Sequence, residues 1–297
     1  MAKGRWHRLA ALVLCVASLA GPAWGCPACL PPAGPSAAQR LAEAEAGLLG
    51  RHAAWLAAAR AQLTPVDAAQ WREQVAFHLD HLEHPEPLIA DFAYAEVARA
   101  PYEAMLAQRA RLDAARVARW LDDPQLAHRA PLYTLLLGLA GGPAATARID
   151  RSTASALRTR DVTHLAALLV AGMLLHGVTQ VAWIERAYLA DRSRSSQELQ
   201  AVLVALQVQG EADAGVPRAR AVAAFRSFIR TRHPLAGYAA PVLAGWQAWD
   251  AVPDYIALLG AGAPQHPASA IALLHYLDRA PGTEGKAAVA AYRASGR

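Results

Sequence analysis

Two cysteines near the start of the chain carry the chemistry that the sequence offers most directly. Cys26 and Cys29 form a Cys-Pro-Ala-Cys motif. Such a pair can cycle between dithiol and disulfide, because the short spacing makes ring closure easy, and its thiolates can supply half of a zinc or copper site. A structural disulfide and lipidation of Cys26 are the alternatives. Leu30 follows Cys29 where covalent haem attachment needs histidine, so that chemistry is excluded.

The densest group of metal-capable side chains lies between residues 78 and 84. His78, His81 and His84 alternate there with acids, among them Glu83. Residues three apart on a helix rotate by roughly 60° per step, so two of these histidines can share a metal but hardly three. Histidines near a helix C-terminus also satisfy its free carbonyl groups. His78, His81 and Glu83 are therefore metal candidates, and the sequence implies no other cofactor.

Aromatic and basic residues later in the chain are candidates for a binding face. Tyr238, Trp246 and Trp249 follow helical spacing and could stack on a sugar or grip a peptide, although we favour core packing for them. Arg148 and Arg151 could meet an anionic glycan or lipid headgroup. Because arginine is nearly the only cation that this chain uses, a solvated face is the alternative.

The sequence contains no familiar catalytic signature. Gly-x-Ser-x-Gly, His-Glu-x-x-His, a phosphate-binding loop and an aspartate-rich calcium loop are all absent. We therefore nominate no catalytic residue and predict that the protein is not an enzyme.

The first 25 residues read as an export signal. Lys3, Arg5 and Arg8 precede the apolar run 9–20, which is too short to span a bilayer, and Ala23-Trp24-Gly25 offers small residues for cleavage. Removal of this segment leaves 26 basic and 24 acidic residues, so the net charge falls from +5 to +2. Charge then gives no support for binding nucleic acid. Export also places the two remaining cysteines where disulfides persist.

Residues 84–101 describe a complete helix and recur along the chain in variant form. Prolines open and close the segment, and the expected buried stripe comprises Ile89, Phe92, Ala93, Val97 and Ala100. Asp91, Glu96 and Arg99 are expected to stay off that stripe. With 55% hydrophobic residues, 18% charged residues and much alanine, leucine and arginine, the composition favours helix throughout.

The helix starts define a period. Pro85, Pro124, Pro234 and Pro267 are separated by 39, 110 and 33 residues, and 110 is close to three periods of about 37. Two starts without proline are therefore expected near residues 161 and 196, the second carrying a Ser-x-x-Glu capping box. A second helix is expected in each period, at about 113–122, 144–157, 178–190, 217–230, 251–260 and 284–295.

Asp123-Pro124-Gln125-Leu126 resembles the Asp-Pro-x-aliphatic opening of a HEAT-repeat helix, and the His-Pro starts resemble variants of it. The resemblance covers about residues 66–297 and implies an α-solenoid. The Cys-Pro-x-Cys after a signal, followed by His-Pro-Glu-Pro-Leu-Ile-Ala, also resembles a group of uncharacterised exported bacterial proteins. That second resemblance implies no activity.

These observations predict an all-α protein, a HEAT-like α-solenoid of about six helix pairs. The expected organisation is a signal peptide (1–25), a spacer with the cysteine motif (26–36), an N-terminal helix (37–63) and the repeat domain (64–297). We expect an exported, periplasmic or envelope-associated binding or scaffolding protein whose partner is a protein or another envelope component. Membrane contact is expected only if Cys26 is lipidated. The alternative is a periplasmic thiol-redox or metal-binding protein that uses Cys26 and Cys29.

Overall fold

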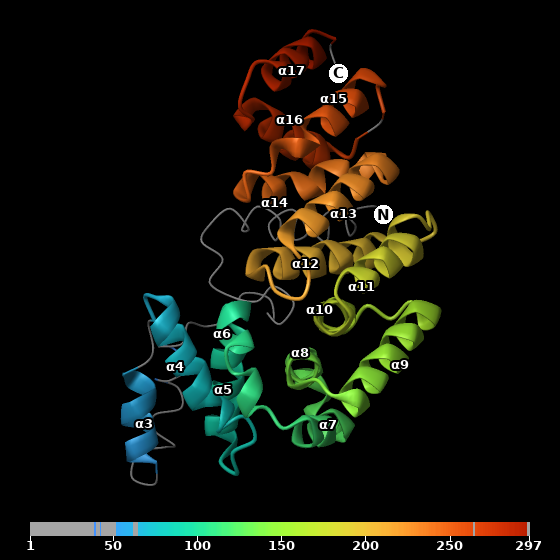
Figure 1. Ribbon diagram of the computed structural model, residues 1–297. Helices are drawn as coiled ribbons and strands as arrows, with labels where there is room; N and C mark the ends of the chain where they lie inside the picture. The colour runs from blue at the N-terminus through green and yellow to red at the C-terminus, as the bar shows by residue number, and fades with distance from the viewer. Residues whose placement is uncertain (1–38, 40–41, 43–51, 62–64, 264, 296–297) are drawn as a thin grey trace, which may run out of the picture. The chain divides into compact units, whose positions relative to one another are not determined.

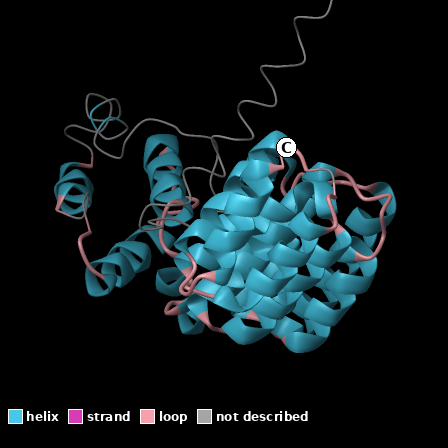
Figure 2. Ribbon diagram, turned by 90° about the horizontal axis from the view of Figure 1, so that it is seen from above, coloured by secondary structure: helices cyan, strands magenta, loops and turns pink. Residues whose placement is uncertain are grey.

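The computed structural model describes residues 39, 42, 52–61, 65–263 and 265–295. Every regular element within those residues is helical, and no strand occurs among them (Figure 2). The expected all-α class is therefore confirmed. The described residues form fifteen α-helices with short 3₁₀ and π segments, which is more than the predicted six pairs. The three α-helices beyond the predicted six pairs are Ala53–Arg60, Ala68–Leu79 and Tyr102–Leu106, all in the N-terminal part of the described chain.

The described chain divides into two compact units, residues 39–175 and 176–295. The helices of the first unit are α3 (Ala53–Arg60), α4 (Ala68–Leu79), α5 (Pro87–Ala98), α6 (Tyr102–Leu106), η2 (Arg109–Arg111), α7 (Ala114–Asp122), η3 (Pro124–Arg129), α8 (Ala130–Ala140), α9 (Pro143–Thr159) and α10 (Leu165–His176), which ends at the boundary. Of the predicted N-terminal helix 37–63, only α3 and two isolated helical residues lie within the described residues.

The helices of the second unit follow in the same manner. They are α11 (Val178–Ile184), the π segment η4 (Glu185–Leu189), α12 (Ser196–Ala212), α13 (Arg218–Thr231), η5 (His233–Ala239), α14 (Ala240–Gly245), η6 (Trp249–Ala251), α15 (Val252–Gly260), α16 (Pro267–Arg279) and α17 (Glu284–Ala294). The six predicted second helices correspond to α7, α9, α11 with η4, α13, α15 and α17, each within a few residues of its expected bounds.

The two helix starts that lack proline are present. At the first, Asp161 accepts hydrogen bonds from the backbone and hydroxyl of Thr163, and α10 begins four residues after the aspartate. At the second, Ser195 and Glu198 form the reciprocal capping box and α12 begins at Ser196. Local side-chain to backbone bonding thus replaces proline as the helix initiator.

Helix α5 buries the stripe that its sequence predicts. Its five predicted residues are all at most 3% exposed. The prediction for Glu96 was wrong, because this carboxylate is fully buried. It accepts hydrogen bonds from Gln74 of α4 and from Arg99, whose Nε lies 2.7 Å away. A carboxylate can occupy a helix's buried face when a cation one turn away and an amide from a neighbour solvate it.

In the second unit, helices contact each other at intervals of one period. Helix α11 packs on α13, α13 on α15, and α15 on α17. In parallel, η5 and α14 pack on α16. We call α12, η5–α14 and α16 the first helices, and α11–η4, α13, α15 and α17 the second helices. Figure 1 shows these elements following one another in chain order from yellow to red.

The least polar helices are interior elements of their units. In α8, all residues from Leu132 to Leu139 are buried, and Gly141 and Gly142 then turn the chain with φ of 71° and 90°. Both glycines occupy the left-handed region that side chains avoid. None of the described helices combines the length and the apolar character that crossing a membrane requires.

Candidate functional site

The cysteine motif lies outside the described residues. The proposed roles of Cys26 and Cys29 in thiol redox chemistry, a disulfide, lipidation or metal binding therefore stay predictions. The export signal before them stays a prediction as well. The histidine, aromatic and arginine candidates all lie within the described residues and are taken in turn.

His78 is an interior residue. Its ring is 1% exposed and lies 4.9 Å from the ring of Phe77 and 5.5 Å from that of Phe92. Burial, together with the positive potential of His81 and Arg99, lowers the pKa of His78 to about 3. The imidazole is therefore neutral at ordinary pH, and its Nδ1 has no hydrogen-bond partner.

The structure does not bring the three metal candidates together. The Nδ1 of His81 is 2.8 Å from the carbonyl oxygen of Phe77, while Glu83 engages Arg129 and Tyr133. Within the described part of the chain, no group of three or more histidine, cysteine, aspartate or glutamate side chains could hold a metal ion. The metal hypothesis for His78, His81 and Glu83 is therefore not supported, since His78 lies among aromatic rings while His81 and Glu83 bond to other groups.

Glu83 instead belongs to a buried polar network that sequence reasoning missed. Arg129, 5% exposed, donates from Nη1 to Glu83 at 2.8 Å and to the carbonyl of Leu82 at 2.8 Å, and from Nη2 to Asp91. Tyr133 donates its hydroxyl to Glu83. Burial lowers the pKa of Arg129, but its bonds to Tyr133 and Glu83 more than offset this, so the guanidinium is charged.

A second buried arginine performs a related task with carbonyl groups alone. Arg232, 7% exposed, donates to the backbone oxygens of Leu189 at 3.1 Å, Tyr188 at 2.7 Å and Asp191. Tyr188 and Leu189 are the last two residues of the π segment η4, where carbonyl groups lack an intrahelical donor, and Asp191 follows shortly after it. Burial lowers the pKa of Arg232, and the attraction of Asp191 and Glu198, opposed by the charge of Arg192, does not offset this.

A sequence signal for both arginines exists. Each precedes a proline by two residues, in Arg129-Ala130-Pro131 and Arg232-His233-Pro234. The same spacing occurs at Arg99, which pairs with the buried Glu96, and at Arg279, which is exposed. The pattern therefore marks helix junctions, and only the packing around each junction decides whether the arginine is buried.

The three aromatic candidates are half-buried, and each contacts a side chain of a neighbouring element. The hydroxyl of Tyr238 is 3.0 Å from Nδ1 of His266, and the ring of Trp249 is 5.1 Å from that of Tyr276. Trp246 packs at 5.7 Å on the ring of Phe225. These contacts join η5, α14 and η6 to their neighbours, which agrees with the core packing that the sequence analysis favoured for Tyr238, Trp246 and Trp249.

The two arginine candidates differ from each other. Arg148 of α9 forms an ion pair of 2.8 Å with Asp122 of α7 and also donates to the carbonyl of Ala118. Its charge is used within the protein. Arg151 is exposed on the same helix. Of the two, only Arg151 remains a candidate for contact with another molecule.

No family model matches the chain, and no curated protein or solved structure is similar enough to it to be detected. The residues and contacts described above therefore carry the whole functional argument.

Proposed function

We propose that this chain is an exported HEAT-like helical-repeat protein that binds or scaffolds a protein or another envelope component, and that it performs no chemistry of its own on that partner. The observation that carries the proposal is the recurrence of the same kind of contact at intervals of one period. Stacked helical hairpins are held by contacts between neighbouring repeats, and they offer extended surfaces for binding.

Contacts between first helices support this architecture. A Cβ added at Gly237 of η5 would overlap the backbone of Ser269 in α16, and one added at Gly210 of α12 would overlap the ring of Trp246. In the unit 39–175, Gly138 of α8 approaches Ala171 of α10 in the same way. The paired residues lie 32, 36 and 33 positions apart, close to one period.

Ion pairs between second helices give a parallel series. Arg220 of α13 meets Glu185 of η4 at 3.0 and 2.5 Å through two hydrogen bonds. Arg226 of α13 donates to Asp254 of α15 at 2.5 Å. Arg148 meets Asp122 in the other unit. Of the two arginine candidates from the sequence, Arg148 thus joins α9 to α7, as Arg220 and Arg226 join neighbouring second helices.

The exposed sides of the second helices are the proposed binding surface. Helix α8 is buried almost all round, whereas α9 exposes Arg151 and α13 exposes Ala223. A partner that touches several repeats must meet the surface that several repeats present, and the second helices present it.

Site-specific photocrosslinking tests this proposal. p-Benzoylphenylalanine is introduced at Arg151 or at Ala223, and at Pro281 in the exposed turn after α16 as the matched control. We expect one discrete crosslinked product in the cell envelope from a second-helix position and none from Pro281. The proposal is wrong if no second-helix position gives a discrete product, or if all three positions give the same products.

A further inference from the structure

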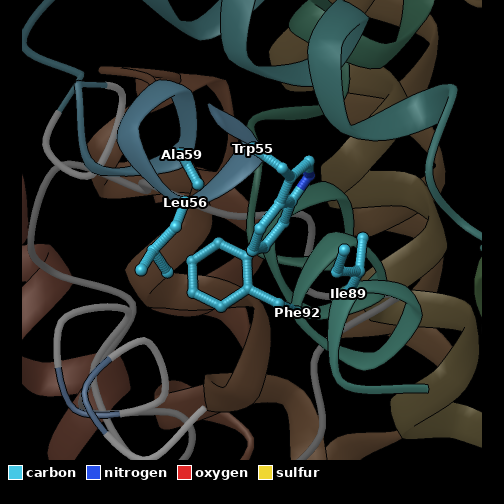
Figure 3. Packing of buried hydrophobic residues seen from close by; sticks show 5 residues of the cluster. All are labelled: Trp55, Leu56, Ala59, Ile89 and Phe92. Atoms are coloured by element: carbon cyan, nitrogen blue, oxygen red, sulfur yellow. The ribbon is translucent and has the colours of Figure 1, made fainter. Parts of the chain in front are cut away.

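Helix α3 is attached to its unit by one narrow apolar face. Trp55, Leu56 and Ala59 are 9%, 2% and 0% exposed, and they pack on Ile89 and Phe92 of α5 (Figure 3). The other side of α3 is exposed at Ala53, Ala54, Ala57 and Arg60. An eight-residue helix is too short to be stable in water by itself, so its helicity depends on this docking.

The docking face contains polar groups that the contact does not satisfy. The indole of Trp55 meets the His78 ring edge-on, with centroids 6.5 Å apart, and the Phe92 ring at 5.6 Å. Both Nε1 of Trp55 and Nδ1 of His78 are buried without a hydrogen-bond partner. Each such group costs free energy when it is docked. The contact is therefore held by apolar packing and opposed by its own polar atoms.

Three more histidines surround the same face. The ring of His81 is 6.3 Å from that of Trp55 and 5.9 Å from that of His84, and the ring of His52 is 5.6 Å from that of His84. His52, which precedes α3, is 3.9 Å from Glu86. Both side chains are partly exposed, so this pair contributes little to docking.

The charged groups facing His78 do not favour a proton there. Arg99, which follows α5, and His81, which follows α4, both oppose a charge on the imidazole. Glu96, the buried carboxylate of α5, is already engaged by Arg99 and Gln74. Trp55, Phe77 and Phe92 cover the ring and offer no acceptor for a second proton. A protonated His78 is thus incompatible with the docked arrangement.

We propose that α3 is an acid-released latch, which docks on α4 and α5 while His78 is neutral and leaves when His78 takes up a proton, uncovering the apolar surface of Phe77, Ile89 and Phe92. The direction follows from linkage: in the docked fold, burial and the charges of His81 and Arg99 lower the pKa of His78 from an ordinary value of 6.5 to about 3. Trp55 contributes part of that burial, so protons bind the undocked state more tightly. Docking is fully favourable above the undocked pKa of His78 and weakens as the pH falls from that pKa toward about 3. This inference concerns regulation and does not depend on the proposed partner.

Amide hydrogen exchange on the full chain tests the latch. The protection factor of residues 53–60, corrected for the intrinsic exchange rate, is compared at pH 7.5, 6.0 and 4.5. We expect it to fall as the pH drops from 7.5 to 4.5, with an upper limit of about 100-fold, which corresponds to a full return of His78 to the ordinary histidine pKa once α3 leaves. The amides of α12 should keep their protection over this range.

Variants of His78 separate the latch from general acid sensitivity. His78→Phe fills the same space without titrating, and His78→Gln keeps a polar group without titrating, so in both the protection of α3 should become independent of pH. The matched control is His275→Phe, which changes an exposed histidine of α16 and should behave like the unchanged protein.

Three results would overturn the proposal. The first is a protection factor of α3 that stays constant down to pH 4.5. The second is a His78 variant that keeps α3 docked at pH 7.5 and loses as much α3 protection in acid as the unchanged protein does, and the third is a loss of α12 protection at the same pH as that of α3. If His78→Phe does not fold or dock, His78→Gln decides the outcome. If neither variant docks, the behaviour of the unchanged protein decides it through the comparison of α3 with α12.

Discussion

First helices and second helices of the unit 176–295 are joined to their neighbours by different physical means. Between first helices, glycine allows close approach, as where Gly237 meets Ser269 and donates its backbone N–H to the serine Oγ at 2.8 Å. Between second helices, arginine reaches a carboxylate, as from Arg220 to Glu185 and from Arg226 to Asp254. Neighbouring first helices are thus joined by close packing, and neighbouring second helices are joined by ion pairs.

The two kinds of contact differ in how strongly they fix the distance between neighbouring helices. Steric repulsion rises steeply over a fraction of an ångström, whereas the energy of a partly exposed ion pair changes slowly with distance and is screened by salt. The glycine contacts therefore set the distance between neighbouring first helices. The arginine pairs tolerate small changes in that distance, so bending of the second-helix surface costs little.

Gly237→Ala should have the largest effect, because the new Cβ would overlap the backbone carbonyl of Ser269. Backbone cannot yield as a flexible side chain can. We expect a loss of about 3 kcal/mol in the free energy of unfolding, measured by urea denaturation. A loss below about 0.5 kcal/mol would contradict a rigid contact between η5 and α16.

Gly210→Ala should cost less, about 1–2 kcal/mol. Its new Cβ would overlap the ring of Trp246, a half-buried side chain that can move partly away. The Arg218 guanidinium over this ring, 5.6 Å from its centroid, should shift with it. The check is urea denaturation together with the Trp246 contribution to fluorescence, isolated with Trp246→Phe. A cost equal to that of Gly237→Ala would show that both contacts are equally rigid.

Removal of the Arg226–Asp254 pair should cost less again. A double-mutant cycle of Arg226→Ala and Asp254→Ala should give a coupling energy of about 0.5–1 kcal/mol that shrinks in about 1 M salt. The penalty of Gly237→Ala should not change with salt. A coupling energy that does not change with salt would contradict the view that charge joins the second helices and packing joins the first helices.

Gly260→Ala is the matched control for the glycine substitutions. Gly260 ends α15 with nothing within 4 Å of a new Cβ. Alanine lowers the entropy of the unfolded chain and suits a helix, so we expect no loss and a gain of up to about 1 kcal/mol. Destabilisation here would mean that helical glycine is required in this chain for reasons other than close approach.

The sequence was sufficient for the positions of helices because their signals are local. The Ser195–Glu198 capping box and the Asp161 turn each operate within a few residues, and both were predictable. Roles of polar side chains were harder to predict. Glu96 was assigned to the surface and lies inside, whereas Trp246, for which core packing was favoured over a binding face, packs on Phe225. Their neighbours come from segments about 20 residues away in the chain, which no local pattern specifies.

By itself, the sequence determined an all-helical chain and the period at which helices recur, since proline, capping residues and apolar spacing act over one or two turns. Only the tertiary structure decided what each charged or aromatic residue does. In the tertiary structure, Arg148 links α9 to α7 and Arg129 is a buried cation paired with Glu83. His78 is a neutral ring that contacts Trp55. The physical reason is that burial and charge compensation depend on residues brought together from distant parts of the chain.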